Sequence, residues 1–321
     1  QCRITTPFHQ AAGRLRELLR GDAAHGTCGV GVGETVRHAL EHPGQEIRYA
    51  DLAPSNPRNP GSLTDRLQTI RQTILAELLP QCRSGIAVAV TREVELLNDE
   101  ALAAKWLASA NALARQCPPA APEEIRRQLT QPGCVLFEGA QGVLLDEWRG
   151  FHPHTTWSSI NTAAVDRVAS RFGIASAIEH LGVLRTYLTR HGAGPLPTHD
   201  TSLDAVLPEP HNAGAGWQGD FRRGHPDAVL LRYALAAVGS LSGLLISHLD
   251  IFQRGVSLKW CERYAVAPSL PQWPRYLEQL PVGGPADLEH QSSLTHLLRN
   301  SCPQYRAEPI RSELEFRKRI A

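Results

Sequence analysis

The sequence predicts an α/β protein, because short apolar runs typical of buried strands alternate with segments that have the spacing of amphipathic helices. One apolar run, Cys134–Phe137, ends at the glycine turn Glu138–Gly142 (EGAQG). Another, Gly182–Leu188, ends at Thr189–Pro195 (TRHGAGP). Strand ends with polar side chains and glycines are where open α/β sheets tend to bind ligands. A chain of 321 residues is long enough for one large α/β domain or two smaller ones.

In the first part of the chain, apolar residues at helical intervals predict mainly helices. We expect helices over 8–19, 34–41, 63–79, 98–116 and 123–129. Between them we expect a glycine loop over 26–33 (GTCGVGVG), a short strand or turn over 47–52, a proline-rich surface loop over 55–62 and a β-branched strand over 85–94. Alternating glycines before a helix can present backbone N–H groups to an anion, so this loop is either a phosphate site or an ordinary turn.

In the second part, residues 158–172 and 175–180 favour helix, and they lie between the two strand ends already named. Gln141, between two glycines, carries both an acceptor and a donor, which suits a nucleobase edge or a phosphorylated oxygen. The alternative is a tight connection with an incidental glutamine. Arg190 and His191 are either ligand groups or part of a strand-terminating turn. Asn212–Arg223 is rich in glycine and predicts a mobile or closable loop.

Composition excludes several classes of protein. With 42% hydrophobic and 20% charged residues and a net charge of +1, the chain lacks the excess of positive charge that would attract nucleic acid. No apolar run approaches the roughly 18 residues of a membrane span and no signal peptide is visible, so we expect a cytoplasmic protein without membrane contact. Seven scattered cysteines without a C-x-x-C pair predict free thiols. We interpret Cys28, in the glycine loop, as a small buried thiol rather than a nucleophile.

Four separated blocks, in the same order along the chain, resemble the adenylosuccinate synthetase family. They are RGDAAHGTCGVGVGE, FEGAQGVLLD with the Thr/Ser/Asn run after it, LGVLRTYLTRHGAGPLPT and DAVLLRYALAAVGSLSGLLISHLDIF, which begin at Arg20, Phe137, Leu181 and Asp227. The last block resembles the family's helix, strand and Lys-Leu-Asp segment. This family condenses IMP with L-aspartate at the expense of GTP.

The resemblance implies a mostly parallel central sheet flanked by helices, related to the P-loop NTPases, in a homodimer. It implies one domain over 1–321, with residues 262–321 weakly matched. The family's phosphate loop, its catalytic Asp and its catalytic His are absent from the printed sequence. We therefore expect a further N-terminal segment before Gln1, which would also carry the Mg²⁺ site, because no metal ligands are visible in the chain.

The resemblance also implies roles for individual residues. The catalytic side chains would be Gln141 and Arg222, the purine nucleotide would contact Thr27, Cys28, Gln141 and Thr156, the amino-acid loop would use Gly219, Asp220 and Arg222, and GTP would contact His248, Asp250 and Arg222. In this reaction GTP phosphorylates the lactam oxygen of the IMP-like base and the amine then displaces phosphate. Mg²⁺ and GTP are the expected cofactor and co-substrate.

Three departures from the family pattern change these expectations. Asp220 stands where the family's Gly-Arg-Pro-Arg-Arg loop has its first arginine, and a carboxylate there would repel an anionic substrate. The amine is therefore either L-aspartate or an altered substrate. Val30 replaces an arginine of the glycine loop, and His248 replaces a lysine whose stem lies along the guanine base.

Two further functions stay open at the sequence level. A non-catalytic relative could keep the scaffold and bind a nucleotide or a partner enzyme. A metal-dependent amidohydrolase could use the H-x-H pair His152 and His154 with other polar side chains, namely His191, His199, His225 and Asp250. Such an enzyme needs regular β/α alternation before its last Asp, whereas a long helical region precedes this H-x-H pair.

Overall fold

A computed structural model of the chain describes residues 2–53, 63–82, 88–174, 178–210, 212 and 216–321. The chain forms two compact units, Gln1–Gln131 (unit 1) and Pro132–Ala321 (unit 2). The single domain expected over 1–321 remains a prediction. The proline-rich loop expected at 55–62 lies outside the described residues.

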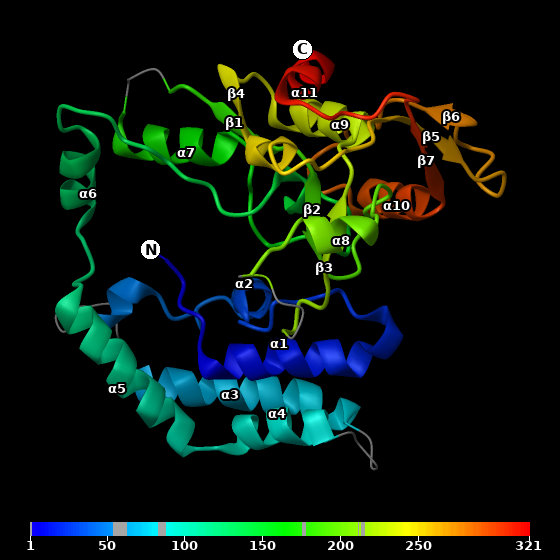
Figure 1. Cartoon of the computed structure of the whole chain (residues 1–321). Helices are drawn as coiled ribbons and strands as arrows, with labels where there is room; N and C mark the ends of the chain where they lie inside the picture. The colour runs from blue at the N-terminus through cyan, green and yellow to red at the C-terminus, as the bar shows by residue number, and fades with distance from the viewer. Residues whose placement is uncertain (1, 54–62, 83–87, 175–177, 211, 213–215) are drawn as a thin grey trace. The chain divides into compact units, whose positions relative to one another are not determined.

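Unit 1 is helical, and Figure 1 shows α1, α3 and α4 side by side. Its α-helices are α1 (Pro7–Arg20), α2 (Val32–Glu41), α3 (Leu63–Leu78), α4 (Val88–Asn98), α5 (Ala101–Gln116) and α6 (Pro122–Leu129). Helix α1 begins where Thr6 caps the backbone N–H of His9 and Pro7 occupies the first turn, and it ends at Gly21 with φ 55°. Its buried face carries Phe8 and Leu15 into the core shared with α3, α4 and α5. The helices predicted for this region are confirmed.

The strand predicted at 85–94 is wrong, because the described part of it, from Val88 onward, belongs to α4. Val90 and Leu97, which are seven residues apart, lie on one helical face and are 6% and 0% exposed. Packing of this face against α1 outweighs the modest β-preference of the valines. The strand or turn expected at 47–52 is a 3₁₀-helix, Tyr49–Leu52, preceded by a single antiparallel bridge between Arg3 and Arg48.

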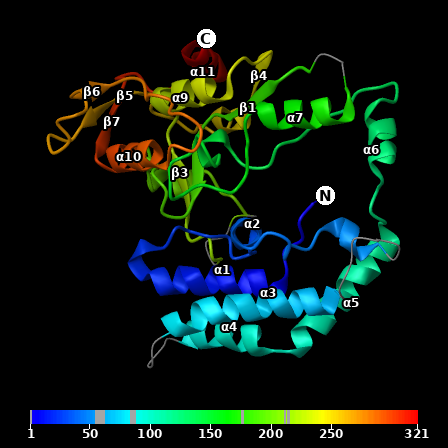
Figure 2. The same cartoon turned by 180° about the vertical axis from the view of Figure 1, so that it is seen from behind.

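In its described residues, unit 2 mixes helices with three small sheets, which Figure 2 shows from behind. Its strands and α-helices are α7 (Ala163–Phe172), β1 (Leu181–Arg185), β2 (Leu188–His191), α8 (Ser202–Val206), β3 (Phe221–Gly224), α9 (Ala228–Val238), β4 (Gly243–Ser247), β5 (Cys261–Val266), β6 (Tyr276–Leu277), α10 (Leu288–Arg299), β7 (Ser301–Tyr305) and α11 (Glu313–Ile320). Strands β1 and β4 pair in parallel, while β2–β3 and β6–β5–β7 are antiparallel. The α/β class is confirmed.

One core of unit 2 joins α9 and α10 to the β5 sheet. Asp227 is central to it, because its carboxylate accepts from the backbone N–H of Val229 and Leu230 at the start of α9. The same carboxylate accepts from the Tyr264 hydroxyl at 2.5 Å. Burial raises the pKa of Asp227 to about 6. This network ties the helix cap to strand β5.

Two of the expected strands differ from the structure. Cys134–Phe137 pairs with no other strand in the described parts of the chain, and Leu136 is 83% exposed. Gly182–Leu188 divides into β1 and the start of β2, and Val183 is 73% exposed rather than buried. An apolar run becomes a buried strand only when neighbouring segments cover it, and this information is not local to the run.

Several smaller expectations can also be assessed. The helix expected from Ser158 begins at Ala163, and residues 178–180 are not helical, while 175–177 lie outside the described residues. All seven cysteines are free, as predicted. Cys28 is exposed, so its interpretation as a buried thiol is wrong. No helix in the described residues has the length and apolar character needed to cross a membrane.

Candidate anion-binding site in unit 2

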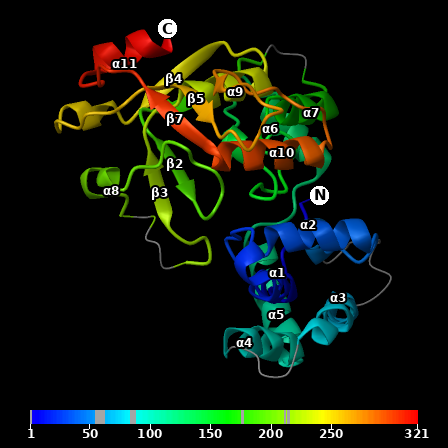
Figure 3. The ribbon, with the colours of Figure 1, turned by 90° about the vertical axis from the view of Figure 1, so that its right-hand side faces the viewer.

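Strands β2 and β3 lie side by side (Figure 3). Their antiparallel register places Arg190 directly opposite Arg222. Arg190 is only 9% exposed, and its Nη2 donates to the carbonyl oxygen of His154 at 2.8 Å. Arg222 donates through Nη2 to the carbonyl oxygens of Gly192 and Gly194. The β2–β3 pair therefore holds two guanidinium groups beside one glycine turn, Gly192–Gly194.

A third guanidinium joins this turn from α10. Arg299 Nη2 donates to the carbonyl oxygen of Ala193 at 3.2 Å and lies 2.7 Å from Nε2 of His154. His154 therefore contacts both Arg190 and Arg299, the first through its backbone and the second through its ring. We call Arg190, Arg222 and Arg299 the guanidinium cluster.

The turn can lie this close to the cluster only because residue 194 has no side chain. A Cβ atom on Gly194 would lie 2.1 Å from Nε and 2.2 Å from Nη2 of Arg190. Such distances are far below van der Waals contact, so any larger residue would displace the guanidinium.

The described residues supply no ion-paired carboxylate to the guanidinium cluster. Burial and the charge of Arg222 lower the pKa of Arg190 to about 10. Burial and the charge of Arg299 also lower the pKa of Arg222, whereas the carboxylate of Asp220 raises it. One buried, one half-buried and one exposed guanidinium group gathered at one turn are suited to binding an anion.

Arg223 does not belong to the cluster, although it follows Arg222 directly. Successive side chains of a strand point to opposite faces. Arg223 accordingly forms an ion pair with Asp204 at 3.0 Å and donates to the carbonyl oxygen of Leu207 at 2.6 Å. Its role is to attach β3 to α8 and the segment that follows it. Asp220 and Gly219 are exposed at the start of β3.

Gln141, assigned from the sequence, lies in an exposed turn with φ 76°. A left-handed backbone is unusual for a residue with a side chain, and such outliers concentrate at functional sites. The fully buried carboxylate of Asp146 organises the segment that follows, since it accepts from the backbone N–H of Trp148, Arg149 and Ile160. Thr156 is held in the same segment, where its N–H donates to the carbonyl oxygen of Leu145 at 2.8 Å.

His248 and Asp250 follow β4. The His248 ring stands edge-on to Tyr187, with 5.5 Å between ring centroids, and its Nδ1 lies 2.9 Å from the Ser247 hydroxyl. Burial lowers the pKa of His248. Asp250 is exposed and pairs with Arg254 at 3.4 Å.

Thr27 and Cys28 lie in unit 1, in the loop before α2. There the Glu17 carboxylate, which is 6% exposed, accepts from the backbone N–H of His25, Gly26 and Thr27 at 2.8–3.3 Å. Although burial favours the neutral acid, these hydrogen bonds and Arg20 lower the pKa of Glu17. The N–H groups of Gly26 and Thr27, at the start of the glycine loop expected over 26–33, are therefore already satisfied by an internal anion.

The histidines of the amidohydrolase alternative do not form one centre. His154 contacts Arg299, whereas His225 bonds to Asp200 and accepts from the backbone N–H of Lys259. Among the residues described, no group of three or more His, Cys, Asp or Glu side chains could hold a metal ion.

Sequence reasoning missed Arg299, His154 as an arginine partner, and Glu17. Arg299 lies in the weakly matched C-terminal region, more than a hundred residues from the turn that it contacts. Glu17 has the ordinary pattern of a charged helix residue. The one signal in the sequence for this arrangement was Gly194, because a glycine in a turn just after an arginine allows the backbone to lie close to the guanidinium group.

Comparison with known proteins gives one consistent result. Residues 1–285 match the adenylosuccinate synthetase family. The chain is 30% identical over 264 residues to adenylosuccinate synthetase from Syntrophotalea carbinolica and 31% identical over 268 residues to that from Shewanella oneidensis. Each match covers 82% of this chain and 57% of the relative, so the chain spans little more than half the length of these relatives.

The fold is similar to that of a solved structure, a fully ligated adenylosuccinate synthetase from Plasmodium falciparum, with a TM-score of 0.63. The similarity covers 95% of this chain and 63% of the other, at 19% sequence identity. At that identity the comparison establishes the fold alone.

Proposed function

Because the chain belongs to the adenylosuccinate synthetase family, we propose that it forms part of a GTP-dependent ligase in purine biosynthesis. In this proposal GTP phosphorylates the base oxygen of an IMP-like nucleotide, and an amine then displaces the phosphate. The observation that carries the proposal is the guanidinium cluster of unit 2, which offers three cations without carboxylate partners among the described residues.

The cluster would act by neutralising charge. Phosphoryl transfer and displacement of phosphate are accelerated mainly by positioning and by stabilising negative charge. Arg222 is the member of the guanidinium cluster that belongs to the glycine-rich segment Asn212–Arg223. We therefore assign it to the anionic groups of the amino acid and of the nucleotide. Arg190 and His154 would hold that arrangement from beneath, because both are buried.

The remaining nucleotide contacts follow the positions matched to the family. Gln141 would orient the phosphorylated base, which requires a side chain presented to solvent from a turn. Thr27, Cys28 and Thr156 would contact the purine nucleotide, with the hydroxyl groups on its phosphate. Asp250 would accept from a guanine edge beside His248, for which its present partner Arg254 must be displaced or shared.

The segment expected to bind the amine departs from the family's sequence at Asp220. Asp220 lies two residues before Arg222 in sequence and its charge acts on that guanidinium. A carboxylate here competes with the carboxylates of L-aspartate for the cluster. We therefore propose that the amine is L-aspartate or a less anionic amino acid, with Gly219, Asp220 and Arg222 as the loop that distinguishes them.

Mg²⁺ is implied by the family, but the described residues supply no ligand set for it. No step of the proposal is assigned to the metal. A homodimeric assembly remains a prediction from the family resemblance, and a cytoplasmic location remains a prediction from the sequence composition.

The test is a ligase assay on the protein isolated from its native source, whose intact mass is compared with the 35.2 kDa of this chain. IMP, GTP and Mg²⁺ are supplied with each member of a panel of amino acids and amines. We measure the aminated nucleotide by mass spectrometry and the released phosphate in parallel. Product with L-aspartate or another panel member, dependent on GTP, supports the proposal.

Arg222→Ala and Arg223→Ala form a matched pair on the same strand. Because only Arg222 belongs to the cluster, we expect kcat/KM to fall about 100-fold for Arg222→Ala and to change less than about threefold for Arg223→Ala. Nucleotide binding without turnover by any amine would instead favour the inactive relative. Absence of both turnover and binding of IMP or GTP would refute the proposal.

A further inference from the structure

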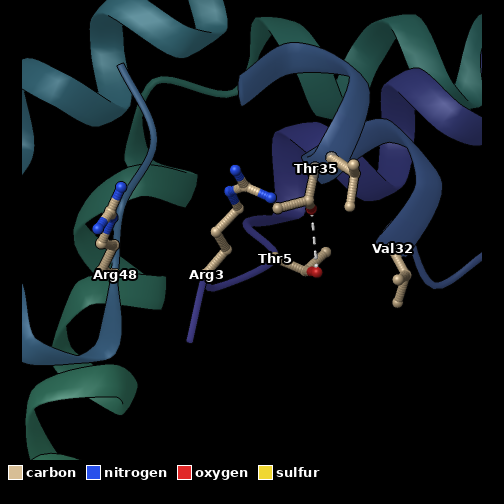
Figure 4. A pocket seen from close by; sticks show the side chains of 6 residues that line it. Arg3, Thr5, Val32, Thr35 and Arg48 are labelled. Atoms are coloured by element: carbon tan, nitrogen blue, oxygen red, sulfur yellow. Dashed lines mark hydrogen bonds between the residues drawn. The ribbon is translucent and has the colours of Figure 1, made fainter. Parts of the chain in front are cut away.

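A cavity of about 500 Å³ lies in unit 1, and none of the residues assigned above lines it. It is lined by Arg3, Thr5, Val32, Thr35, Val36 and Arg48. Figure 4 shows the side chains of Arg3 and Arg48 on neighbouring segments, with Thr5 and Thr35 next to Arg3. Two guanidinium groups and two hydroxyl groups thus line one cavity.

The two arginines are paired in an unfavourable way. Arg3 and Arg48 are opposite residues of an antiparallel bridge. The backbone N–H of Ile4 donates to the Ile47 carbonyl oxygen, and that of Tyr49 donates to the Cys2 carbonyl oxygen, each at 2.8 Å. These bonds flank the pair, so it is a non-hydrogen-bonded pair, in which the side chains are closest. Like charges directly opposite one another destabilise such a bridge, and an anion between them would reverse the effect.

Neighbouring carboxylates neutralise only part of this charge. Arg48 donates to the Glu46 carboxylate at 2.8 Å. Arg3 forms no ion pair with a carboxylate of any residue that the structure describes. Both arginines are exposed at the cavity mouth, so an incoming anion would reach them without a change of fold.

The two threonines add oriented hydroxyl groups. The Thr35 hydroxyl lies 3.0 Å from Thr5 Oγ1 and 2.9 Å from the carbonyl oxygen of Gly31. When Thr35 donates to Thr5, the proton of Thr5 is available for a third group. Thr35 lies near the N-terminus of α2, and its backbone N–H donates to the carbonyl oxygen of Gly31 at 2.9 Å.

From this geometry we propose that the cavity binds a phosphate monoester. Two guanidinium groups and a hydroxyl suit the phosphoryl oxygens. A volume of about 500 Å³ exceeds the needs of a phosphate ion alone, and Val32 and Val36 offer apolar surface to the organic part. The ligand is therefore a small phosphorylated metabolite, and none of the residues that line the cavity is among those assigned to the nucleotide.

The experiment measures binding to the full chain by isothermal titration calorimetry. The probes are inorganic phosphate, ribose 5-phosphate, glycerol 3-phosphate and IMP, together with ribose as a neutral control. We expect at least one monoester to bind more than tenfold more tightly than inorganic phosphate. Binding should weaken with salt, because ion pairs supply much of it.

The variants Arg3→Gln and Arg48→Gln should each weaken that monoester at least tenfold, while IMP binding at its own site is retained. Arg92→Gln is the matched control, because Arg92 is an exposed arginine of α4 that does not line the cavity. Thr5→Val tests the hydroxyl with little change of shape. Circular dichroism confirms that each variant is folded.

Three results would overturn the inference. One is the absence of monoester binding at millimolar concentration, and another is an equal loss of affinity in Arg92→Gln. The third is loss of IMP binding together with monoester binding in Arg3→Gln, which would make the cavity part of the nucleotide site. The failure of the proposed ligase reaction would leave this binding test unaffected, since it measures affinity alone.

Discussion

Acid is expected to destabilise unit 1 through His9. This side chain is 1% exposed within α1, and its ring lies 5.2 Å from that of His38. Its Nδ1 accepts from the Thr6 backbone N–H at 3.2 Å, which completes the capping box of the helix. Protonation of Nδ1 would break that bond. Burial and the charge of His38 lower the pKa of His9 from 6.5 to about 4.

The sign and the size of the effect follow from linkage. The folded state keeps His9 neutral, whereas the unfolded chain takes up a proton below pH 6.5. The stabilisation is therefore fully present above pH 6.5, declines as the pH falls from 6.5 towards 4, and then levels off. At about 1.4 kcal/mol per pKa unit, the free energy of unfolding falls by about 2.5 kcal/mol between pH 7.5 and pH 4.5 through this residue alone.

The variant His9→Gln isolates this term. Glutamine at the third helical position can accept from the capping residue's N–H and does not titrate. We expect its stability at pH 7.5 to be lower than that of the parent, with the difference between pH 7.5 and pH 4.5 smaller by about 2.5 kcal/mol.

The assay is urea unfolding followed by far-ultraviolet circular dichroism at several pH values. The matched control is His296→Gln, since His296 is exposed on α10 of unit 2. An unchanged pH dependence in His9→Gln, or the same reduction in His296→Gln, would refute the assignment.

Two predictions concern unit 2. Asp227→Ala removes the cap of α9 and leaves the buried Tyr264 hydroxyl without its acceptor, so we expect the free energy of unfolding to fall by about 3 kcal/mol, against about 1 kcal/mol for Tyr264→Phe. Urea unfolding measures both, and equal losses would contradict the shared network. Leu136→Ala should cost less than about 0.5 kcal/mol because the side chain is 83% exposed. Leu294 is fully buried, so Leu294→Ala should lower the free energy of unfolding by about 2–5 kcal/mol. A similar loss for Leu136→Ala would support the buried strand that the sequence predicted at Cys134–Phe137.

The sequence by itself determined the features that depend on neighbours in the chain. Thr6 and Gly21 mark the ends of α1, and apolar spacing locates α2, α3 and α5. Capping groups and helical periodicity act within a few residues, so they can be interpreted without knowledge of the fold. The family resemblance was equally available, because it depends on ordered blocks of residues.

Only the tertiary structure decided which groups meet across the chain. Arg190, Arg222 and Arg299 come from β2, β3 and α10, and nothing local to any of them indicates the shared turn. Glu17 reaches the glycine loop from the middle of a helix, and α1 converts a β-branched segment into α4. Burial and charge pairing depend on what lies opposite a residue in space, which is why the class, the helices and the family were predictable while the guanidinium cluster was not.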